Sequence, residues 1–139
     1  MIAIHKRVEA LEGALREIEG LPFGYAAGEC DCVRFPARVV VNATGRDPLE
    51  GLSWGSLETA ILAVESDAGT LSATLDKRFE RIAPSRAIVG DLVAIAAEPI
   101  SPAFDVALGV FDGDRALFWL DGGLRRAPRS RIAIAWRVG

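Results

Sequence analysis

The stretch Ile88-Val-Gly-Asp-Leu-Val-Ala-Ile95 marks the point, just after Pro84, where the character of the sequence changes. It is a short apolar run rich in β-branched residues, which is typical of a β-strand. Turn residues, among them Asp112-Gly113 and Asp121-Gly122, separate the later runs of the same kind and predict hairpins. The expected strands are residues 88–95, 106–111, 115–120, 123–127 and 132–138. The chain after Pro84 therefore predicts a meandering antiparallel sheet of about five strands.

The residues before Pro84 predict helices. Gly20 and Pro22 end an apolar stripe whose members recur every three or four residues, the spacing of one helix face over about four turns. The stripe consists of Ile4, Val8, Leu11, Leu15 and Ile18. Asp31 is a good N-cap for a second helix, in which Pro36 removes a backbone donor and predicts a kink or a wide first turn.

Two further helices and the class of the fold follow from the remaining signals. Hydroxyl side chains place helix starts at Ser53 or Ser56, for a helix through Val64, and at Thr70, for a short helix to about Asp76. Helices come first and an antiparallel sheet follows, which defines an α+β protein. The 139 residues are enough for a real core, and we expect residues 1–139 to form a single domain.

Composition excludes several classes of protein. Half of the residues are hydrophobic and 25% are charged, which excludes a disordered tail. The net charge of −3 excludes a generally basic surface, so we expect no nucleic-acid partner. The longest apolar run, Leu92–Ala97, is far below the about 20 residues that a membrane-spanning helix needs. The N-terminus lacks the apolar core of a signal peptide, so we expect synthesis in the cytoplasm and no membrane.

The chain is poor in metal-binding side chains. Its soft ligands are Cys30, Cys32 and a single histidine, His5. This set excludes a zinc site with cysteine and histidine ligands at the usual spacings, and we expect neither a metal nor a cofactor.

Charge is distributed unevenly along the chain. Residues 1–76 carry six basic and twelve acidic side chains, whereas residues 115–139 carry six arginines and one aspartate. The arginines either face solvent from exposed strands or form a basic face for an acidic partner.

Cys32 is the strongest candidate for chemistry. It directly follows the expected N-cap Asp31, and unpaired backbone N–H groups together with the helix dipole stabilise a thiolate at such a position. A lowered pKa would make this thiol a nucleophile. Two other interpretations stay open. Cys32 is a small apolar residue of the core, or it forms a redox pair with Cys30, although their spacing is not the Cys-x-x-Cys of thioredoxin-like proteins.

Three motifs resemble those of NlpC-type, papain-like cell-wall peptidases. In that family a loop rich in tyrosine and glycine leads into a helix that starts Asp-Cys-Ser-Gly-Phe, and strands reading Gly-Asp-Leu-Val and His-Val-Gly-Ile-Tyr follow. The matching residues are Pro22, Phe23, Tyr25, Gly28, Asp31, Cys32 and Phe35, then Gly90–Val93 and Leu108–Phe111. The resemblance implies a papain-like fold with Cys32 as the candidate nucleophile. The candidate cleft residues beside it are Tyr25, Asp31 and Arg34.

The chain resembles one small family more closely still, whose members occur in the tail-gene regions of tailed phages and prophages. That family shows Trp/Tyr-Gly-x-x-Asp-Cys, a stretch that begins with Ala and ends in Gly-x-Asp-Pro, and Gly-Asp-Leu/Val-Val. A Leu-Gly-Val strand with an Asp-Gly turn, a Gly-Leu pair and a closing Ala-Trp-Arg-Val follow. The corresponding residues are Asp31-Cys32, Ala37–Gly45, Asp47-Pro48, Gly90–Val93, Leu108–Gly113, Gly123-Leu124 and Ala135–Val138. The match runs nearly from end to end and implies a role in a phage tail.

The peptidase resemblance breaks at the residues that would activate Cys32. The position of the histidine base, two residues before the strand glycine, is Ala107, and the residue that orients the base falls near Trp119. Val33-Arg34 replaces the Ser-Gly that follows the cysteine in that family. Without a general base the reaction loses a rate enhancement of about 10²–10⁴-fold.

Other residues could replace the missing base only with a shifted pKa or from an unexpected position in the fold. The leaving amine needs a proton donor, and Asp31, Asp105 or Asp121 supplies one only if its pKa is strongly raised. Arg34 either holds a Cys32 thiolate electrostatically or is an exposed helix arginine. His5 lies far from Cys32 in the sequence, so only a first helix folded over the cleft would bring it into reach.

We therefore expect a tail-associated module of a phage or prophage that keeps a hydrolase-like fold without its catalysis. It acts in tail assembly or in binding, with tail proteins or a peptidoglycan fragment as its partners, and a place in the virion is compatible with this role. The first alternative is an active cysteine peptidase or amidase that cuts peptide bonds of the cell wall with Cys32. The second is a thiol-based acyl carrier or redox protein.

Overall fold

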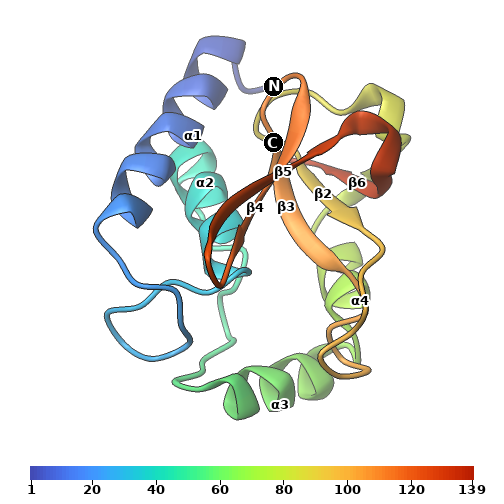
Figure 1. Ribbon diagram of the computed structural model, residues 1–139. Coiled ribbons are helices and arrows are strands. Elements are labelled where there is room, and N and C mark those ends of the chain that lie inside the picture. The colour runs from blue at the N-terminus through green and yellow to red at the C-terminus, as the bar shows by residue number, and fades with distance from the viewer.

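The computed structural model describes residues 1–139 and confirms the α+β prediction, with helices first and strands after them (Figure 1). The helices are α1 (Ile4–Glu19), α2 (Arg34–Thr44), α3 (Leu57–Asp67) and α4 (Leu71–Asp76). The strands are β1 (Glu80–Ile82), β2 (Leu92–Ile95), β3 (Ala107–Phe111), β4 (Arg115–Leu120), β5 (Gly123–Pro128) and β6 (Ile132–Arg137). Two short 3₁₀ helices, η1 (Pro84–Arg86) and η2 (Arg129–Arg131), lie between strands.

The strands form one six-stranded antiparallel sheet in the order β1-β6-β2-β3-β4-β5. The prediction of a five-stranded meander differs from this sheet in two respects. Strand β1 is missing from the prediction, because its three residues, two of them exposed, show no alternation of polar and apolar side chains. Strands β2 to β5 do form a meander, but β6 returns to lie between β1 and β2.

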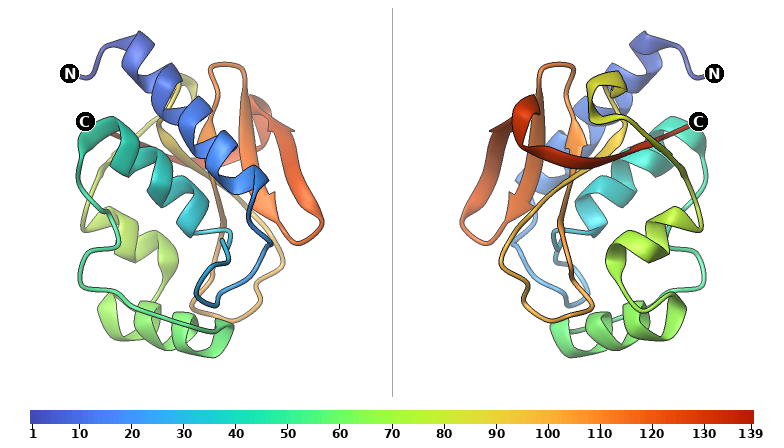
Figure 2. Two further views of the ribbon diagram at one scale, coloured as in Figure 1. Left: turned by 90° about the vertical axis from the view of Figure 1, so that its left-hand side faces the viewer. Right: turned by 90° about the vertical axis from the view of Figure 1, so that its right-hand side faces the viewer.

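Side chains from all four helices pack against one face of the sheet and enclose the main core with it. Figure 2 shows the ribbons of α1 and α2 side by side against the sheet. Trp136 of β6 is fully buried in this core. A smaller apolar cluster lies on the other face of the sheet, where no long helix covers it. It consists of Ala87, Val93, Phe111, Ala116, Phe118, Ala127, Ile132 and Ala135. Successive residues of a strand therefore face two different apolar environments.

The predicted first helix is present as α1, but it does not bury the whole predicted apolar stripe. Leu11 and Ile18 are buried, whereas Ile4 is 55% exposed and Val8 is 36% exposed. The helix instead turns the long side chain of Arg7 inward, and that side chain is completely buried.

Asp91, from the Gly-Asp-Leu-Val motif, is the buried partner of Arg7. Its Oδ1 accepts a hydrogen bond from Nη1 of Arg7 at 3.2 Å and from the backbone N–H of Val138 at 3.0 Å. Its Oδ2 accepts from Nε of Arg137 and from the backbone N–H of Ile88, both at 3.0 Å. One carboxylate therefore fastens the start of α1, the approach to β2 and the end of β6 to one another.

The predicted caps of α3 and α4 are confirmed. Of the two candidates for α3, Ser56 rather than Ser53 is the N-cap, and it forms a reciprocal capping box with Thr59. Thr70 caps α4 by accepting a hydrogen bond from the backbone N–H of Ala73. None of the helices combines the length and the apolar character needed to cross a membrane.

Candidate functional site

Asp31 holds the segment that carries Cys32. The Asp31 side chain is buried, and its Oδ1 accepts hydrogen bonds from the backbone N–H groups of Val33 at 2.9 Å and Arg34 at 2.8 Å. Asp31 therefore caps the turn that leads into the helix and lies two residues before Val33, which is the N-cap position of α2 and has no side-chain cap bond. The regular helix begins only at Arg34, because Pro36 has no N–H to donate to the carbonyl of Cys32. The residues just before Arg34 therefore form the predicted wide first turn.

The Cys32 thiol is half-buried and faces Tyr25, whose hydroxyl oxygen lies 3.7 Å from Sγ. Burial raises the pKa of this thiol, and the Asp31 carboxylate adds to the rise. The Tyr25 hydroxyl and the backbone N–H groups of Cys32 and Val33 lower the pKa without cancelling the effect of burial. The expectation of a lowered pKa is therefore wrong, because desolvation outweighs the stabilisation offered by the helix start.

Cys30 lies deeper than Cys32, with 1% of its surface exposed. Burial, with the Asp31 carboxylate as the second cause, raises the pKa of the Cys30 thiol to about 11. Both cysteines are free thiols. The backbone of Cys30 pairs with that of Phe23 in an isolated parallel bridge, and its carbonyl accepts a hydrogen bond from Nε1 of Trp119 at 2.9 Å. The loop before Cys32 is therefore folded back on itself and fastened to β4.

Arg34 and Trp54 join this loop to the segment that follows α2. The Arg34 guanidinium lies 5.3 Å from the centre of the Trp54 ring, and it donates to the carbonyls of Trp54 at 2.6 Å and Tyr25 at 3.1 Å. The indole N–H of Trp54 donates to Oδ2 of Asp31 at 2.8 Å. The Nε of Arg34 also lies 3.4 Å from Oδ2 of Asp31. Arg34 therefore holds backbone carbonyls and the Asp31 carboxylate, and its contacts do not support the alternative that it holds a Cys32 thiolate. Sequence reasoning treats Trp54 as a core or half-core residue, or as one that lines a groove, and does not predict its bond to Asp31. The one available signal for that bond is that an indole N–H removed from water needs an acceptor.

The two positions that the peptidase resemblance gives to the base and its orienting residue lie on opposite faces of the sheet. Ala107 packs against the smaller cluster, on the face away from the helices. Its neighbour Leu108 belongs to the main core, against which Cys32 packs. Trp119 also packs against the main core, and it reaches the loop before Cys32. A histidine in place of Ala107 would therefore point away from Cys32.

His5 lies at the far end of the helix pair from Cys32. Helices α1 and α2 pack side by side in opposite directions. The contacts that fix the direction are Glu17 with Arg38 at 2.7 Å and Asn42 with the carbonyl of Ala10 at 3.2 Å. Cys32 precedes α2, next to the C-terminal end of α1, whereas His5 is in the first turn of α1. The helix rises by about 21 Å between residues 5 and 19, so His5 does not act on Cys32.

The three aspartates considered as proton donors have other positions or partners. Asp105 accepts hydrogen bonds from the backbone N–H of Ser72, at 3.1 Å, and from the Ser72 hydroxyl, and so fastens α4. Asp121 is exposed in the turn between β4 and β5. Asp31 accepts three N–H bonds at the start of α2. The structure therefore brings Tyr25, Asp31 and Arg34 together around Cys32 but adds no acid–base group.

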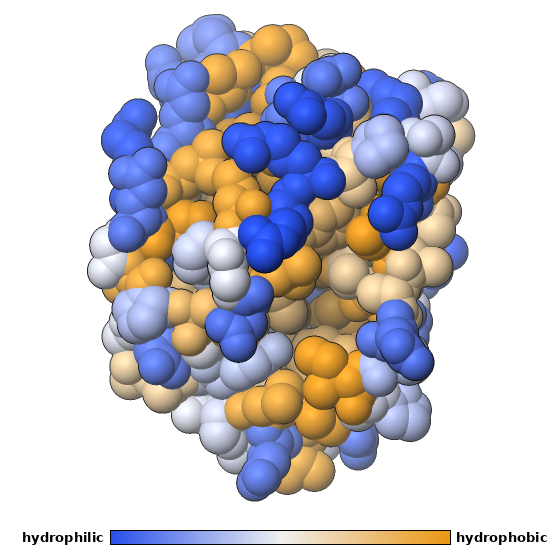
Figure 3. Space-filling view, viewed as in Figure 1, coloured by the Kyte–Doolittle hydropathy of each residue, from blue (hydrophilic) through white to orange (hydrophobic).

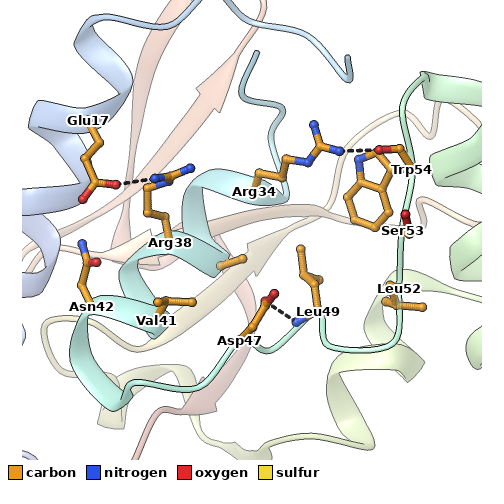
Figure 4. A pocket seen from close by; sticks show the side chains of 11 residues that line it. Glu17, Arg34, Arg38, Val41, Asn42, Asp47, Leu49, Leu52, Ser53 and Trp54 are labelled. Carbon is orange, nitrogen blue, oxygen red and sulfur yellow. Dashed lines mark hydrogen bonds and ion pairs between the residues drawn. The ribbon is translucent and has the colours of Figure 1, made fainter. Parts of the chain in front are cut away.

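A groove of about 540 Å³ lies beside this segment, between the outer face of α2 and residues 47–54 (Figure 4). Its apolar lining consists of Ala37, Val41, Leu49, Leu52 and Trp54. Its charged lining consists of Glu17, Arg34, Arg38 and Asp47, with Asn42 and Ser53 as polar neighbours. Cys32 does not line this groove, but the shared wall of Arg34 and Trp54 connects the two places. No sequence motif predicts the groove, because it depends on how residues 47–54 return past α2.

The fold and the site define an α+β protein whose motif cysteine is held at a helix start with no histidine beside it. The chain belongs to the family described as Domain of unknown function (DUF6950), whose profile matches residues 4–138 and thus nearly the whole chain. No curated protein matches the sequence. No three side chains among histidine, cysteine, aspartate and glutamate are placed to hold a metal ion.

Proposed function

We propose that this protein is a tail-associated module of a phage or prophage, with a papain-like, NlpC-type fold that is not used for hydrolysis. The tail context rests on the resemblance of the sequence to tail-region proteins. The positions of three residues support the papain-like fold. Cys32 precedes a helix that packs on the sheet, Asp91 immediately precedes the central strand β2, and Trp119 lies beside the cysteine loop. We further propose that the protein is made in the cytoplasm and carried in the virion.

The surroundings of the Cys32 thiol carry the proposal that catalysis is lost. The one side chain that hydrogen-bonds this thiol is Tyr25, and burial raises the thiol pKa. A protonated thiol is a poor nucleophile, because the thiolate is the reactive form. With His5 at the other end of α1 and Ala107 facing the other cluster, the general-base contribution of about 10²–10⁴-fold is missing.

The proposed binding role is supported by the groove between α2 and residues 47–54 (Figure 4). A lining that combines apolar side chains with charges of both signs suits a peptide, either from a tail protein or from peptidoglycan. Arg34 and Trp54 form one wall of the groove and also hold Asp31. A ligand in the groove would therefore rest on the same clamp that positions Cys32.

The test of this function is Cys32→Ala, with Cys30→Ser as the matched control. We expect that neither the wild type nor either variant releases soluble peptides from purified peptidoglycan. We also expect phage particles that carry Cys32→Ala to assemble normal tails. Peptide release that depends on Cys32 would overturn the proposal and establish the alternative, an active cell-wall cysteine peptidase or amidase. Loss of tails in Cys32→Ala particles would also count against it.

The pH dependence of thiol alkylation gives a second readout that needs no substrate. In the Cys30→Ser background, the alkylation rate of Cys32 should reach its midpoint above the ordinary thiol pKa of about 8.5, because burial raises the pKa. A midpoint well below that value would indicate an activated thiolate and favour the peptidase.

A further inference from the structure

Strand β5 is a free edge of the six-stranded sheet. It comes last in the strand order and pairs only with β4. Figure 2 shows β5 at the outside of the sheet, with no other ribbon beyond it. The opposite edge is β1, which has three residues against six in β5. An edge strand offers its outer N–H and C=O groups to another chain, so β5 presents the longer row of such groups.

The register of the hairpin between β4 and β5 fixes which backbone groups point outward. Leu120 pairs with Gly123 across a two-residue turn, and the two residues of such a closing pair exchange both of their hydrogen bonds. Inward and outward positions alternate from there, so the N–H and C=O groups of Leu124 and Arg126 point away from β4. Pro128, which has no N–H, occupies the next outward position. Strands tolerate proline at edge positions of this kind, which agrees with the assignment.

The outward groups of Leu124 and Arg126 have no backbone partner. No backbone group outside the strand pairs of the sheet bonds to either residue, and β5 has no second neighbouring strand. The one side chain that touches these groups is Arg125, whose Nη1 lies 3.5 Å from the carbonyls of Gly122 and Leu124. This distance is long for a hydrogen bond, so an incoming strand can displace the contact. The edge therefore suits β-strand addition, in which an extended peptide joins a sheet through main-chain hydrogen bonds.

Arginines flank this edge on both faces of the sheet. Arg125 lies opposite Phe118 on the face of the smaller cluster, whereas Arg126 lies opposite Leu117 on the face of the main core. Both arginines are exposed, and neither forms an ion pair. Figure 3 shows strongly hydrophilic residues over β5. Neighbouring residues of an incoming strand also point to opposite faces, so two adjacent acidic residues would place one carboxylate on each side of the edge.

We propose that the β5 edge binds an extended segment of another protein that carries two adjacent acidic residues. The backbone of this segment pairs with Leu124 and Arg126, and its two carboxylates meet Arg125 and Arg126. Main-chain bonds hold any extended strand, whereas the arginines select an acidic one. The inference does not rest on the proposed function, because it involves neither Cys32 nor the groove.

A second copy of the same chain is a poorer occupant of this edge. Antiparallel pairing of two β5 strands uses the outward groups of Leu124 and Arg126 in both copies only when Arg125 of one copy lies opposite Arg125 of the other. Like charges directly opposite each other destabilise a strand pair. Charged residues on an edge strand also protect a sheet from pairing with copies of itself. The arginines that attract an acidic strand therefore repel a second β5.

The first test follows amide hydrogen exchange in β5 by NMR. In the free protein the amides of Leu124 and Arg126 should exchange fast, and those of Arg125 and Ala127 slowly. The probe is the peptide Thr-Val-Glu-Glu-Val-Thr, blocked at both ends, at about 20 mM salt, where exposed charges are weakly screened. At about 90% occupancy the peptide should slow the exchange of Leu124 and Arg126 about tenfold, because only the free molecules exchange. The matched peptide with two lysines in place of the glutamates should give no protection.

Three results of this test would overturn the proposal. Protection of Leu124 and Arg126 in the dilute free protein would mean that the edge is closed. An acidic peptide that does not bind at millimolar concentration, or that binds without protecting these amides, would exclude strand addition. Protection that appears without peptide as the protein concentration rises would assign the edge to a second copy instead.

The second test compares Arg126→Ser with Arg126→Pro. Residue 126 is exposed and its N–H points away from β4, so circular dichroism should show both variants folded. Arg126→Ser removes one charge and should weaken binding of the acidic peptide about two- to fivefold. Arg126→Pro removes the backbone donor as well and should weaken binding about five- to tenfold further.

The matched control for charge is Arg46→Ser. Arg46 is exposed and lines a pocket with Glu80 of β1, at the opposite edge of the sheet, so this variant should bind the peptide within about twofold of the wild type. Equal binding by Arg126→Ser and Arg126→Pro would overturn the backbone pairing. An effect of Arg46→Ser as large as that of Arg126→Ser would mean that overall charge attracts the peptide, and it would overturn the proposal as well.

Discussion

Asp31 and Asp91 are both completely buried, and both come from motifs that the peptidase resemblance singles out. Asp31 accepts hydrogen bonds from Val33, Arg34 and Trp54, all within 23 residues of it in the sequence. Asp91 instead binds Arg7, 84 residues before it, and Arg137, 46 residues after it. Asp31 therefore shapes one segment, whereas Asp91 joins the first helix, a central strand and the last strand.

The two motifs therefore match the peptidase pattern for different physical reasons. The aspartate of the Gly-Asp-Leu-Val motif serves the architecture, since it is the counter-charge of the buried Arg7. The aspartate of the Asp-Cys motif shapes one helix start, which places a thiol beside Tyr25 without activating it. The presence of both motifs is therefore evidence about structure, and chemistry has to be argued from the surroundings of Cys32.

Asp91→Asn should have the largest effect on stability. The amide keeps the shape of the side chain but removes the charge, which leaves Arg7 buried without its counter-charge. Breaking one side of a buried ion pair costs about 3–5 kcal/mol, so the free energy of unfolding measured in urea should fall by that amount. The double variant Arg7→Met/Asp91→Asn should lose less than the sum of the two single variants. A loss below about 1 kcal/mol for Asp91→Asn would remove the distinction between the two aspartates.

Asp31→Asn should have a smaller effect on stability and a larger one on the thiols. The ion partner of Asp31, Arg34, is 27% exposed, so its charge stays partly solvated, unlike that of the fully buried Arg7. Loss of the charged cap, of the charged acceptor for Trp54 and of this ion pair should therefore lower the free energy of unfolding by about 1–2 kcal/mol.

Because the Asp31 carboxylate raises the pKa of both Cys30 and Cys32, its removal should lower both values and speed alkylation at pH 8. Asp91→Asn is the control and should leave the alkylation profile unchanged. An identical profile for wild type and Asp31→Asn would contradict this account.

Local signals in the sequence predict much of the fold. Ser56 and Thr70 cap the expected helices, because a hydroxyl needs only the backbone three residues later. The return of β6 to the β2 edge and the burial of Arg7 could not be predicted, because both depend on residues far apart in the chain. Ile4 and Val8 are exposed for the same reason, since the pairing of Arg7 with Asp91 sets the face that α1 turns inward.

The candidate site also contains some features that local sequence signals predict and others that depend on packing. The bonds that Asp31 accepts from the backbone of Val33 and Arg34 are local and follow from the sequence, although α2 itself begins two residues later than predicted. The direction of the Cys32 pKa shift does not follow from the sequence, since it depends on how much packing removes the thiol from water. The face occupied by Ala107 is also beyond sequence reasoning, because a shift of one residue in a strand moves every side chain to the other face.

Trp54→Phe should remove a single bond to Asp31 and leave its other partners in place. The ring still packs beside Arg34, but the N–H donor at 2.8 Å is lost, and the free energy of unfolding should fall by about 1 kcal/mol. Trp119→Phe removes a matched donor at 2.9 Å to the carbonyl of Cys30 and should have a similar effect. Only Trp54→Phe should also change the alkylation rate of Cys32 through Asp31. Equal alkylation rates in the two variants would argue against a clamp that acts through this aspartate.

Tyr25→Phe should have the smallest effect on stability near neutral pH, because the ring keeps its edge contact with Phe23 and only the 3.7 Å bond to Sγ is lost. That bond lowers the pKa of Cys32, so its removal should raise the pKa further and slow alkylation at pH 8–9.

The raised pKa of Cys32 also sets the direction in which the free energy of unfolding changes with pH. The folded state keeps the thiol protonated, so this contribution is fully present below the unfolded thiol pKa of about 8.5 and is lost as pH rises through the folded pKa. Between about pH 8 and 9.5, where the unfolded thiol ionises before tyrosine does, the free energy of unfolding should decline in the wild type and at least as steeply in Tyr25→Phe. In Cys32→Ala the decline should be shallower. Faster alkylation in Tyr25→Phe would mean that Tyr25 holds the thiol in its neutral form, and the effect of Asp31 on Cys32 would then have to be assigned anew.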